Sequence, residues 1–185
     1  AEPTQSPSVE LDDEFAKMLL VKNEKFLPEM EIFTTSSQVG YSSSVMNASG
    51  LGTKETVAEI VLAHWLSGTF LWDKIRTTGG AYGASATVSS IAKCFTFSTY
   101  RDPNPLKSVD VFIESLKEAA QVNLSNEECD KLITGTYGEE FLPVSPATEG
   151  RIGLIRILAS VSNEDQKDKL KNLLSVKPED LKDAA

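Results

Sequence analysis

Histidine is almost missing from this sequence: its 185 residues include a single one, His64, together with only two cysteines, Cys94 and Cys129. A catalytic zinc site normally takes two His or several Cys, with a carboxylate. These three residues stand far apart and form no CxxC or HxxxH pair, and no GxSxG motif accompanies His64. We therefore expect no metal site and no nucleophilic catalytic site made by this chain alone, and we interpret both cysteines as buried or free thiols.

Positive charge is scarce as well, because 18 Lys and Arg stand against 27 Asp and Glu, a net charge of −9. Nucleic-acid binders usually carry a basic stripe, which this sequence lacks. No apolar run approaches the ~20 residues that span a bilayer, and no basic region followed by an apolar one begins the chain. The acidic excess indicates a solvated surface, or alternatively an acidic wall that attracts basic peptides.

Hydrophobic residues make up 41% of the chain and charged residues 24%, as in an ordinary globular protein. A chain of this length buries roughly two thirds of its unfolded surface without disulfides or metal. Residues 1–12 are polar and rich in Pro and Ser, so we expect a loose leader there. Residues 13–185 are expected to form a single α+β domain.

The first half of that domain is predicted to contain strands and a long helix. Residues 31–45 mix β-branched and aromatic residues with Ser, which suggests one or two strands. Thr53 is a plausible N-cap for a helix whose apolar stripe runs along residues 57–75. His64 lies on that stripe and is interpreted as a core histidine. Trp72 is expected to pack in the core beneath the strands that follow.

An antiparallel hairpin is predicted after the long helix, which a double glycine at 79–80 ends. Two β-prone runs, 81–89 and 92–100, flank a two-residue turn at 90–91. A peptide could add a strand to the edge of the first run, which is a recurrent mode of recognition.

The second half is predicted to be mainly helical. Residues 101–104 are interpreted as a turn whose Asp and Asn satisfy backbone groups, or alternatively as a contact with a substrate. Asn104 is the expected N-cap of the next helix, with Pro105 at the first helical position. Ser125 and Glu128 form a capping box that begins another helix. Further helices are expected at residues 152–161, at 164–174 and from Pro178. The whole pattern predicts a two-layer α+β sandwich of a mostly antiparallel sheet with helices on one face.

The residues most suited to chemistry stand between the long helix and the hairpin. Arg76 is near the end of the helix, and Tyr82 follows six residues later, just past two glycines. A guanidinium and a phenol both donate hydrogen bonds, which suits a carbonyl oxygen that becomes an oxyanion. In the structural alternative, Arg76 caps the helix and Tyr82 packs in the sheet. A phosphate loop is rejected, because it would follow a strand and precede a helix.

The segment IRTTGGAYG, followed by a strand and then STYRDPN, resembles the carboxyl-terminal half of pitrilysin/insulinase-family zinc metallopeptidases. Within that family, the presequence-protease and falcilysin-like branch is the most similar. The stretch from Gly153 to Ala185 is also similar to the family's closing helices, so the resemblance covers most of the chain from Glu31 onward. It implies a LuxS/MPP-like domain, the last domain of a larger protease. Family members usually continue into a last strand, so truncation at the C-terminus is expected.

The resemblance implies a zinc metalloendopeptidase that degrades unfolded, presequence-like peptides inside a chamber. Zinc would be bound by the amino-terminal half of the same protein, through an inverted HxxEH motif that this chain lacks. The chain alone should bind no catalytic zinc and cleave nothing. In the parent enzyme, Arg76 and Tyr82 would contribute to substrate binding and oxyanion stabilisation. Four small residues are the accompanying substrate-binding candidates: Gly79, Gly80, Ala81 and Gly83.

The resemblance also points to partners and a compartment. Peptide substrates and the amino-terminal half of the same protein are the expected partners, without nucleic acid or a membrane span. The location implied is a mitochondrion or plastid-type organelle, or alternatively the bacterial cytoplasm. The alternative function is a stand-alone, non-catalytic binding or scaffold subunit, like the family-like core subunits of respiratory complexes. The presence of Arg76 and Tyr82 favours the protease domain, since a scaffold has no evident need for both.

Overall fold

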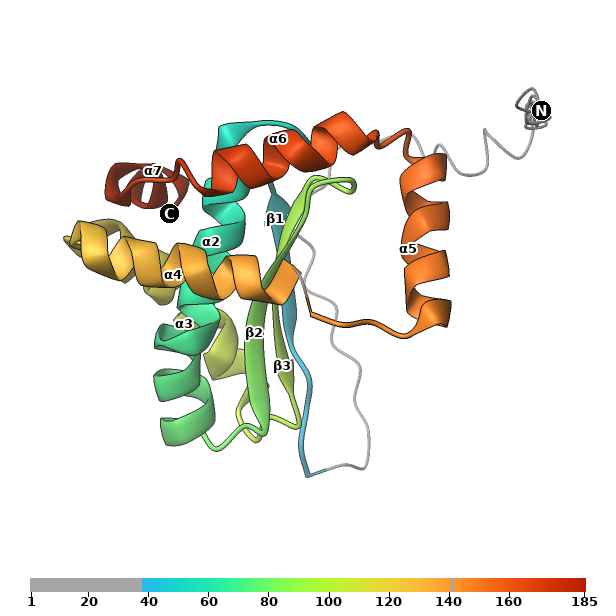
Figure 1. The fold of residues 1–185 in the computed structure, drawn as a ribbon. Helices are drawn as coiled ribbons and strands as arrows, with labels where there is room; N and C mark the ends of the chain where they lie inside the picture. Colours follow the sequence, from blue (N-terminus) through green and yellow to red (C-terminus); the bar gives the residue numbers. More distant parts are fainter. Residues whose placement is uncertain (1–37, 141) are drawn as a thin grey trace, which may run out of the picture. The chain divides into compact units, whose positions relative to one another are not determined.

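The computed structural model describes residues 38–140 and 142–185 of the chain (Figure 1). The chain separates into two units, and the second, Ser37–Ala185, contains every described element. The predicted leader at residues 1–12 and the predicted strand residues before position 38 lie outside the described residues.

Three antiparallel strands form the sheet: β1 (Ser43–Asn47), β2 (Gly83–Ser89) and β3 (Cys94–Tyr100), in the order β1-β3-β2. Side chains alternate between the two faces of a strand. On the central strand β3, Phe95, Phe97 and Thr99 are buried while the residues between them are only half-buried. The sheet therefore has one face against the core, and the α+β class predicted from the sequence is confirmed.

The predicted hairpin is present, but the two-residue turn at 90–91 is wrong. Ser89 pairs with Cys94, so the connection has four residues, 90–93. Lys93 takes a left-handed φ of 52° and its carbonyl accepts a hydrogen bond from Ala48 N at 2.9 Å. The Ser89 hydroxyl accepts from Ala92 N at 3.2 Å. These bonds hold Ala92 and Lys93 in the turn, although their side chains are compatible with a strand.

The predicted long helix is two helices instead of one. Thr53 caps α2 (Lys54–Gly68) as expected, since its hydroxyl accepts from Thr56 N at 3.2 Å. The α-helix stops at Thr69, whose hydroxyl donates to Trp65 O at 2.7 Å and whose backbone leaves helical geometry. A glycine followed by a β-branched residue that bonds back to the preceding turn weakens a helix at that point.

The chain then continues as a π-helix, η1 (Trp72–Thr78). Its wider turn shifts the side chains relative to the predicted stripe. Leu71 and Ile75 are buried, whereas Trp72 is 46% exposed. The expectation that Trp72 packs in the core beneath the hairpin is therefore wrong.

Five α-helices follow the sheet, and their ends largely match the predictions. The Ser125–Glu128 capping box is confirmed, with Ser125 N donating to Glu128 Oε2 at 2.8 Å and Glu128 N donating to Ser125 Oγ at 3.2 Å. The helix predicted at 152–161 begins earlier, because Ser145 is its N-cap and Pro146 occupies its first turn. The bounds are α3 (Pro105–Gln121), α4 (Asn126–Glu140), α5 (Pro146–Leu158), α6 (Asn163–Leu173) and α7 (Pro178–Ala184).

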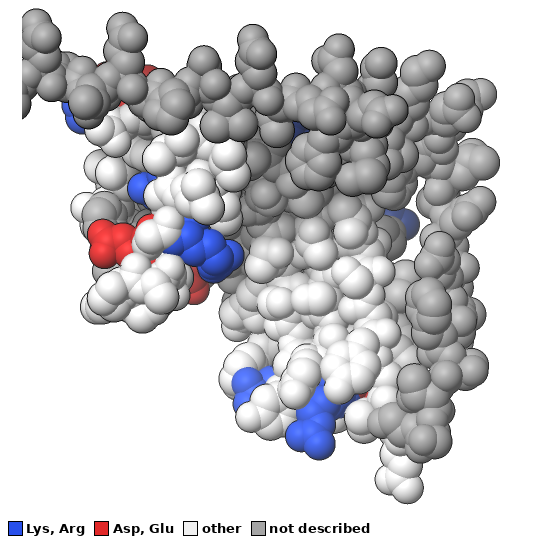
Figure 2. Space-filling view, turned by 90° about the vertical axis from the view of Figure 1, so that its right-hand side faces the viewer, with Lys and Arg blue, Asp and Glu red and all other residues white. Residues whose placement is uncertain are grey.

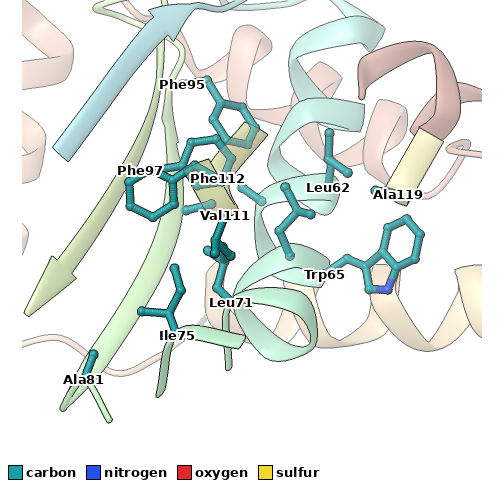
Figure 3. Packing of buried hydrophobic residues seen from close by; sticks show 13 residues of the cluster. Leu62, Trp65, Leu71, Ile75, Ala81, Phe95, Phe97, Val111, Phe112 and Ala119 are labelled. Carbon is teal, nitrogen blue, oxygen red and sulfur yellow. The ribbon is translucent and has the colours of Figure 1, made fainter. Parts of the chain in front are cut away.

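Helix α2 lies at the centre of the packing and contributes to two apolar clusters. One cluster joins α2 and α3 to the sheet, where the rings of Phe97 and Phe112 stack 4.9 Å apart (Figure 3). The other joins α2 to α4, α6 and α7 and contains Val61, Cys129 and Leu181. Helix α5, in contrast, contributes no buried residue. None of the described helices is both long and apolar enough to cross a membrane.

An ion pair ties the beginning of α2 to α7, and it predicts how stability depends on pH. Lys54 Nζ lies 2.6 Å from Asp180 Oδ2, which also accepts from Lys177 N at 2.8 Å. Burial by itself raises the pKa of Asp180, but the Lys54 ammonium and the Lys177 backbone N–H outweigh it, so this pKa lies below its ordinary value of 3.8. A carboxyl whose pKa is lower in the folded state stabilises the fold above its unfolded pKa and loses that contribution as the pH falls.

We expect Asp180→Asn to lower the free energy of unfolding at pH 7, by less than about 1 kcal/mol because a partly exposed pair is screened by solvent. Urea denaturation of both proteins should show this difference shrink as the pH falls below about 4, through the folded pKa. Asp183→Asn, an exposed position on the same helix, is the matched control. An Asp180→Asn effect that is the same at pH 7 and pH 3 would contradict the assignment.

Candidate functional site

An open depression of about 560 Å³ lies at the end of the sheet where β2 begins. It brings together the end of η1, the connection from η1 to β2, and the connection from β3 to α3. Two of the predicted site residues, Arg76 and Tyr82, line it together, so the structure places them in one site. The complete lining is Val39, Arg76, Thr77, Gly80, Ala81, Tyr82 and Arg101.

Arg76 stands in the last turn of η1, and its side chain stacks on Trp72. The guanidinium carbon lies 3.8 Å from the centre of the Trp72 ring, which is a cation–π contact. No carboxylate among residues 38–140 and 142–185 forms an ion pair with Arg76. The exposed Trp72 therefore has a role that the sequence did not predict, since it holds the guanidinium while its hydrogen-bond donors stay available.

Tyr82 does not pack in the sheet, as the structural alternative required. The residue is 67% exposed, and its ring makes a T-shaped contact with another aromatic ring. Tyr100 lies 5.6 Å from Tyr82 and 5.5 Å from Tyr41, with interplanar angles of 70° and 71°. We call these three residues the tyrosine ladder. T-shaped contacts of this kind favour one ring orientation over others, so the ladder sets the direction of the Tyr82 phenol.

The two glycines before Tyr82 have different structural roles. A side chain at Gly79 would place its Cβ 2.5 Å from Ile75 O, so only glycine fits there. Gly80 has a φ of 79°, which L-residues rarely adopt. Ala81 is buried and donates its N–H to Ile75 O at 3.1 Å. Of the four predicted small residues, Gly80 and Ala81 line the depression, whereas Gly79 and Gly83 do not.

The opposite wall of the depression is held by Asp102, whose side chain is 1% exposed. Its carboxylate accepts from Asn104 N at 2.7 Å and from the Ser108 hydroxyl at 2.6 Å. Its backbone exchanges hydrogen bonds with Gly40, at 2.7 and 2.8 Å. The prediction that Asp102 satisfies backbone groups in a turn is confirmed. Asn104 is the N-cap residue of α3 and Pro105 stands in its first turn, as predicted. The Asn104 side chain makes no capping hydrogen bond, and its amide donates instead to Gly79 O at 3.5 Å.

Arg101 is not among the predicted site residues; it belongs to the turn at residues 101–104, for which a substrate contact is the alternative interpretation. It precedes Asp102, has a left-handed φ of 49°, and lines the same depression as Arg76 and Tyr82. The strand register is the signal that locates it, since Gly83 lies opposite Tyr100 and the next residues on each side are therefore neighbours.

Figure 2 shows the face seen from the right-hand side of Figure 1. Some Lys and Arg side chains (blue) lie higher up in this view, and others are visible at its lower end among mostly uncharged atoms (white). In Figure 1 this is the end of the sheet where β2 begins. In a chain with a net charge of −9, that end is suited to an anionic or electron-rich ligand group.

His64 and the cysteines lie away from this site. His64 is 29% exposed between α2 and α4 rather than in the core, and its Nδ1 lies 3.1 Å from Glu139 Oε1. Both cysteines are free thiols, and burial raises the pKa of the Cys129 thiol. In the part of the chain that the structure describes, no three His, Cys, Asp or Glu side chains form a group that could hold a metal ion.

The free edge of β2 is partly occupied. The hydroxyl of Ser67 on α2 accepts a hydrogen bond from Ala86 N at 2.8 Å and lies 3.3 Å from Ala86 O. The middle of this strand is therefore not open for the peptide strand that the sequence analysis considered there.

Comparison with known sequences assigns the chain to one family. Residues 30–185 match the family described as the PreP C-terminal domain. Presequence protease 1 of Arabidopsis thaliana, described as chloroplastic/mitochondrial, is 30% identical over 155 residues, which cover 84% of this chain and 14% of that protein. The mitochondrial presequence protease of Candida albicans is 25% identical and covers 95% of this chain and 17% of that protein. The chain thus spans about a sixth of these relatives' length.

Comparison with solved structures supports the fold. The inactive peptidase domain of a proposed zinc protease from Bordetella parapertussis superposes with a TM-score of 0.64, at 15% identity, over 82% of this chain and 88% of that one. A protease from Helicobacter pylori gives a TM-score of 0.61 at 14% identity, over 82% of this chain and 38% of that one. At such identities the likeness concerns the fold alone.

We expect Asp102→Ala to destabilise the domain by roughly 2–4 kcal/mol, because it leaves the Ser108 hydroxyl and the Asn104 N–H without their buried acceptor. Thermal unfolding followed by circular dichroism measures this loss. Asp102→Asn, which keeps one carbonyl acceptor, should lose less. Asp110→Ala, at an exposed position on α3, is the control. Equal melting temperatures for Asp102→Ala and this control would show that the Asp102 hydrogen bonds do not stabilise the turn between β3 and α3.

Proposed function

The chain belongs to the family of the PreP C-terminal domain, as its IRTTGGAYG and STYRDPN segments predicted, and from that premise we propose that it completes a peptide-degrading protease. In this proposal it is the C-terminal domain of a zinc metalloendopeptidase that cleaves unfolded, presequence-like peptides. The observation that carries the proposal is the position of Arg76 and Tyr82, which line one open depression. Neither side chain uses its donors in a hydrogen bond or ion pair within the described residues.

The proposed task of the two side chains is to bind the scissile carbonyl oxygen and to stabilise the negative charge that develops on it during hydrolysis. The Tyr82 hydroxyl donates one hydrogen bond and the Arg76 guanidinium another. Donors held in place before the reaction contribute about 10²–10³ in rate each. Trp72 holds the guanidinium by stacking and the tyrosine ladder orients the phenol, so little reorganisation is needed when the charge appears.

The residues of this chain do not fit a catalytic zinc ion. Its one histidine pairs with Glu139, and its two cysteines lie in β3 and α4. We therefore propose that zinc is held by another part of the parent protein, and that this domain supplies hydrogen-bond donors only. On its own the chain is expected to be inactive. The amino-terminal half of the parent is then its proposed partner.

The proposed substrates and location follow the relatives. Presequence proteases are named for targeting peptides, and those of Arabidopsis and Candida are described as chloroplastic/mitochondrial or mitochondrial. We propose that the parent of this chain works on similar peptides in such an organelle. The net charge of −9 supports basic peptides as substrates, because an acidic wall attracts them.

In the intact protease, Tyr82→Phe should lower kcat by about 10²–10³ with little change in KM. The ring and its contact with Tyr100 remain, so only the hydroxyl donor is lost. Steady-state kinetics on an unfolded peptide measures both constants, with Tyr137→Phe on α4 as the control. A loss confined to KM would make Tyr82 a binding residue, and an unchanged kcat/KM would remove it from the site.

The native size of the protein tests the proposal against the stand-alone alternative. An antibody raised against this domain should detect, in an extract of the source cells, a band several times larger than 20.1 kDa. A band near 20.1 kDa would contradict a single-chain protease, and would favour a binding or scaffold subunit.

A further inference from the structure

We propose that Arg101 recognises a carboxylate of the bound peptide, as a second guanidinium beside Arg76 and Tyr82. This inference rests on the proposed function, since it takes the occupant of the depression to be a peptide. It adds a specificity-determining residue to the two that the sequence singled out. It also specifies the chemical group that Arg101 binds, a carboxylate.

The first support for this inference is that the arginines in the depression have no carboxylate partner among the described residues. Arg76 and Arg101 both line it, and neither has a carboxylate partner among residues 38–140 and 142–185. Acidic side chains outnumber basic ones by 27 to 18 in this chain, so partners are abundant. Five lysines do pair with them: Lys54, Lys74, Lys131, Lys167 and Lys171. Two arginines left unpaired in one depression are therefore available for an anionic ligand.

The backbone of Arg101 is the second support. Its φ of 49° lies in the left-handed region, which costs a residue with a side chain about 1–2 kcal/mol. The neighbouring Asp102 holds that conformation by its bonds to Gly40, Asn104 and Ser108. Glycine would take this φ without strain. The fold thus tolerates strain at a position whose exposed side chain forms no hydrogen bond or ion pair with residues 38–140 and 142–185.

The geometry of the site indicates a carboxylate. A guanidinium presents paired N–H donors in a planar fork that matches the two oxygens of a carboxylate. An unmodified peptide carries no other anionic group, so its terminal carboxylate or an Asp or Glu side chain is the ligand. The volume of about 560 Å³ is sufficient for a terminal residue with its side chain. The tyrosine ladder offers an apolar surface beside it.

Three forms of one fluorescently labelled, unfolded peptide test this, all measured with the intact protein. The first has one internal glutamate and a free C-terminus, the second has an amidated C-terminus, and the third has glutamine in place of the glutamate. Fluorescence anisotropy gives Kd for each form, and kinetics give kcat and KM. The variants are Arg101→Gly, which relieves the backbone strain, and Arg101→Lys, which keeps the charge but loses the fork. Arg151→Ala, an exposed arginine on α5, is the control.

The unaltered protein should bind one of the two altered peptides, the amide form or the glutamine form, about tenfold more weakly than the first peptide. The form that binds weakly identifies the carboxylate that Arg101 binds. Arg101→Gly should abolish this preference at unchanged or higher melting temperature. Arg101→Lys should keep part of the preference, and Arg151→Ala all of it. Equal binding of the three peptides by the unaltered protein would overturn the inference, as would a preference that persists in Arg101→Gly. An equal loss for all three peptides in Arg101→Gly would also overturn it.

These readouts are independent of the proposed catalysis. Failure of the proposed function appears as normal turnover in Tyr82→Phe, whereas failure of the carboxylate subsite appears as an unchanged ratio of Kd values in Arg101→Gly.

Discussion

The corner where β3 turns into α3 depends on one buried carboxylate. Asp102 accepts hydrogen bonds from Asn104 N and the Ser108 hydroxyl, and its backbone pairs with Gly40 in the segment that leads into β1. A buried acceptor of this kind is costly to remove, because its donors are left unsatisfied. It joins the beginning of α3, the approach to β1 and the end of the central strand. Arg101 and the tyrosine ladder stand on that corner, so the orientation of the candidate site follows from it.

The other wall of the site depends on the π-helix. A regular α-helix continued from α2 would have turned Trp72 toward the core, as the apolar stripe predicted. The break at Gly68 and Thr69 and the wider turn of η1 place Leu71 and Ile75 inside and Trp72 outside. Trp72 then lies beneath the Arg76 guanidinium. A change of helix type thus converts a residue predicted for the core into support for a residue of the site.

The Asp102 turn and the π-helix also show which features of the structure can be predicted from the sequence and which cannot. The α+β class, the antiparallel hairpin and the Ser125–Glu128 capping box depend on local patterns and were predicted correctly. Arg76 and Tyr82 were proposed from a donor pair beside a double glycine and from the family resemblance, and both line one depression. The π-helix, the four-residue turn and the role of Trp72 depend on contacts between distant residues, which no local pattern reports. Arg101 was not predicted as a site residue because its neighbour Asp102 explained the turn, although a substrate contact there was the alternative. Only the pairing of β2 with β3 places Arg101 beside Tyr82.

The central claim is that this domain presents hydrogen-bond donors to the carbonyl oxygen of a peptide whose cleavage is carried out elsewhere in the same protein. The most direct measurement is a crystal structure of the intact protein with a phosphinic peptide, which mimics the tetrahedral intermediate of hydrolysis. The account predicts that one phosphinyl oxygen lies within about 3 Å of both the Tyr82 hydroxyl and the Arg76 guanidinium. A peptide bound with that oxygen in contact with neither side chain would contradict it.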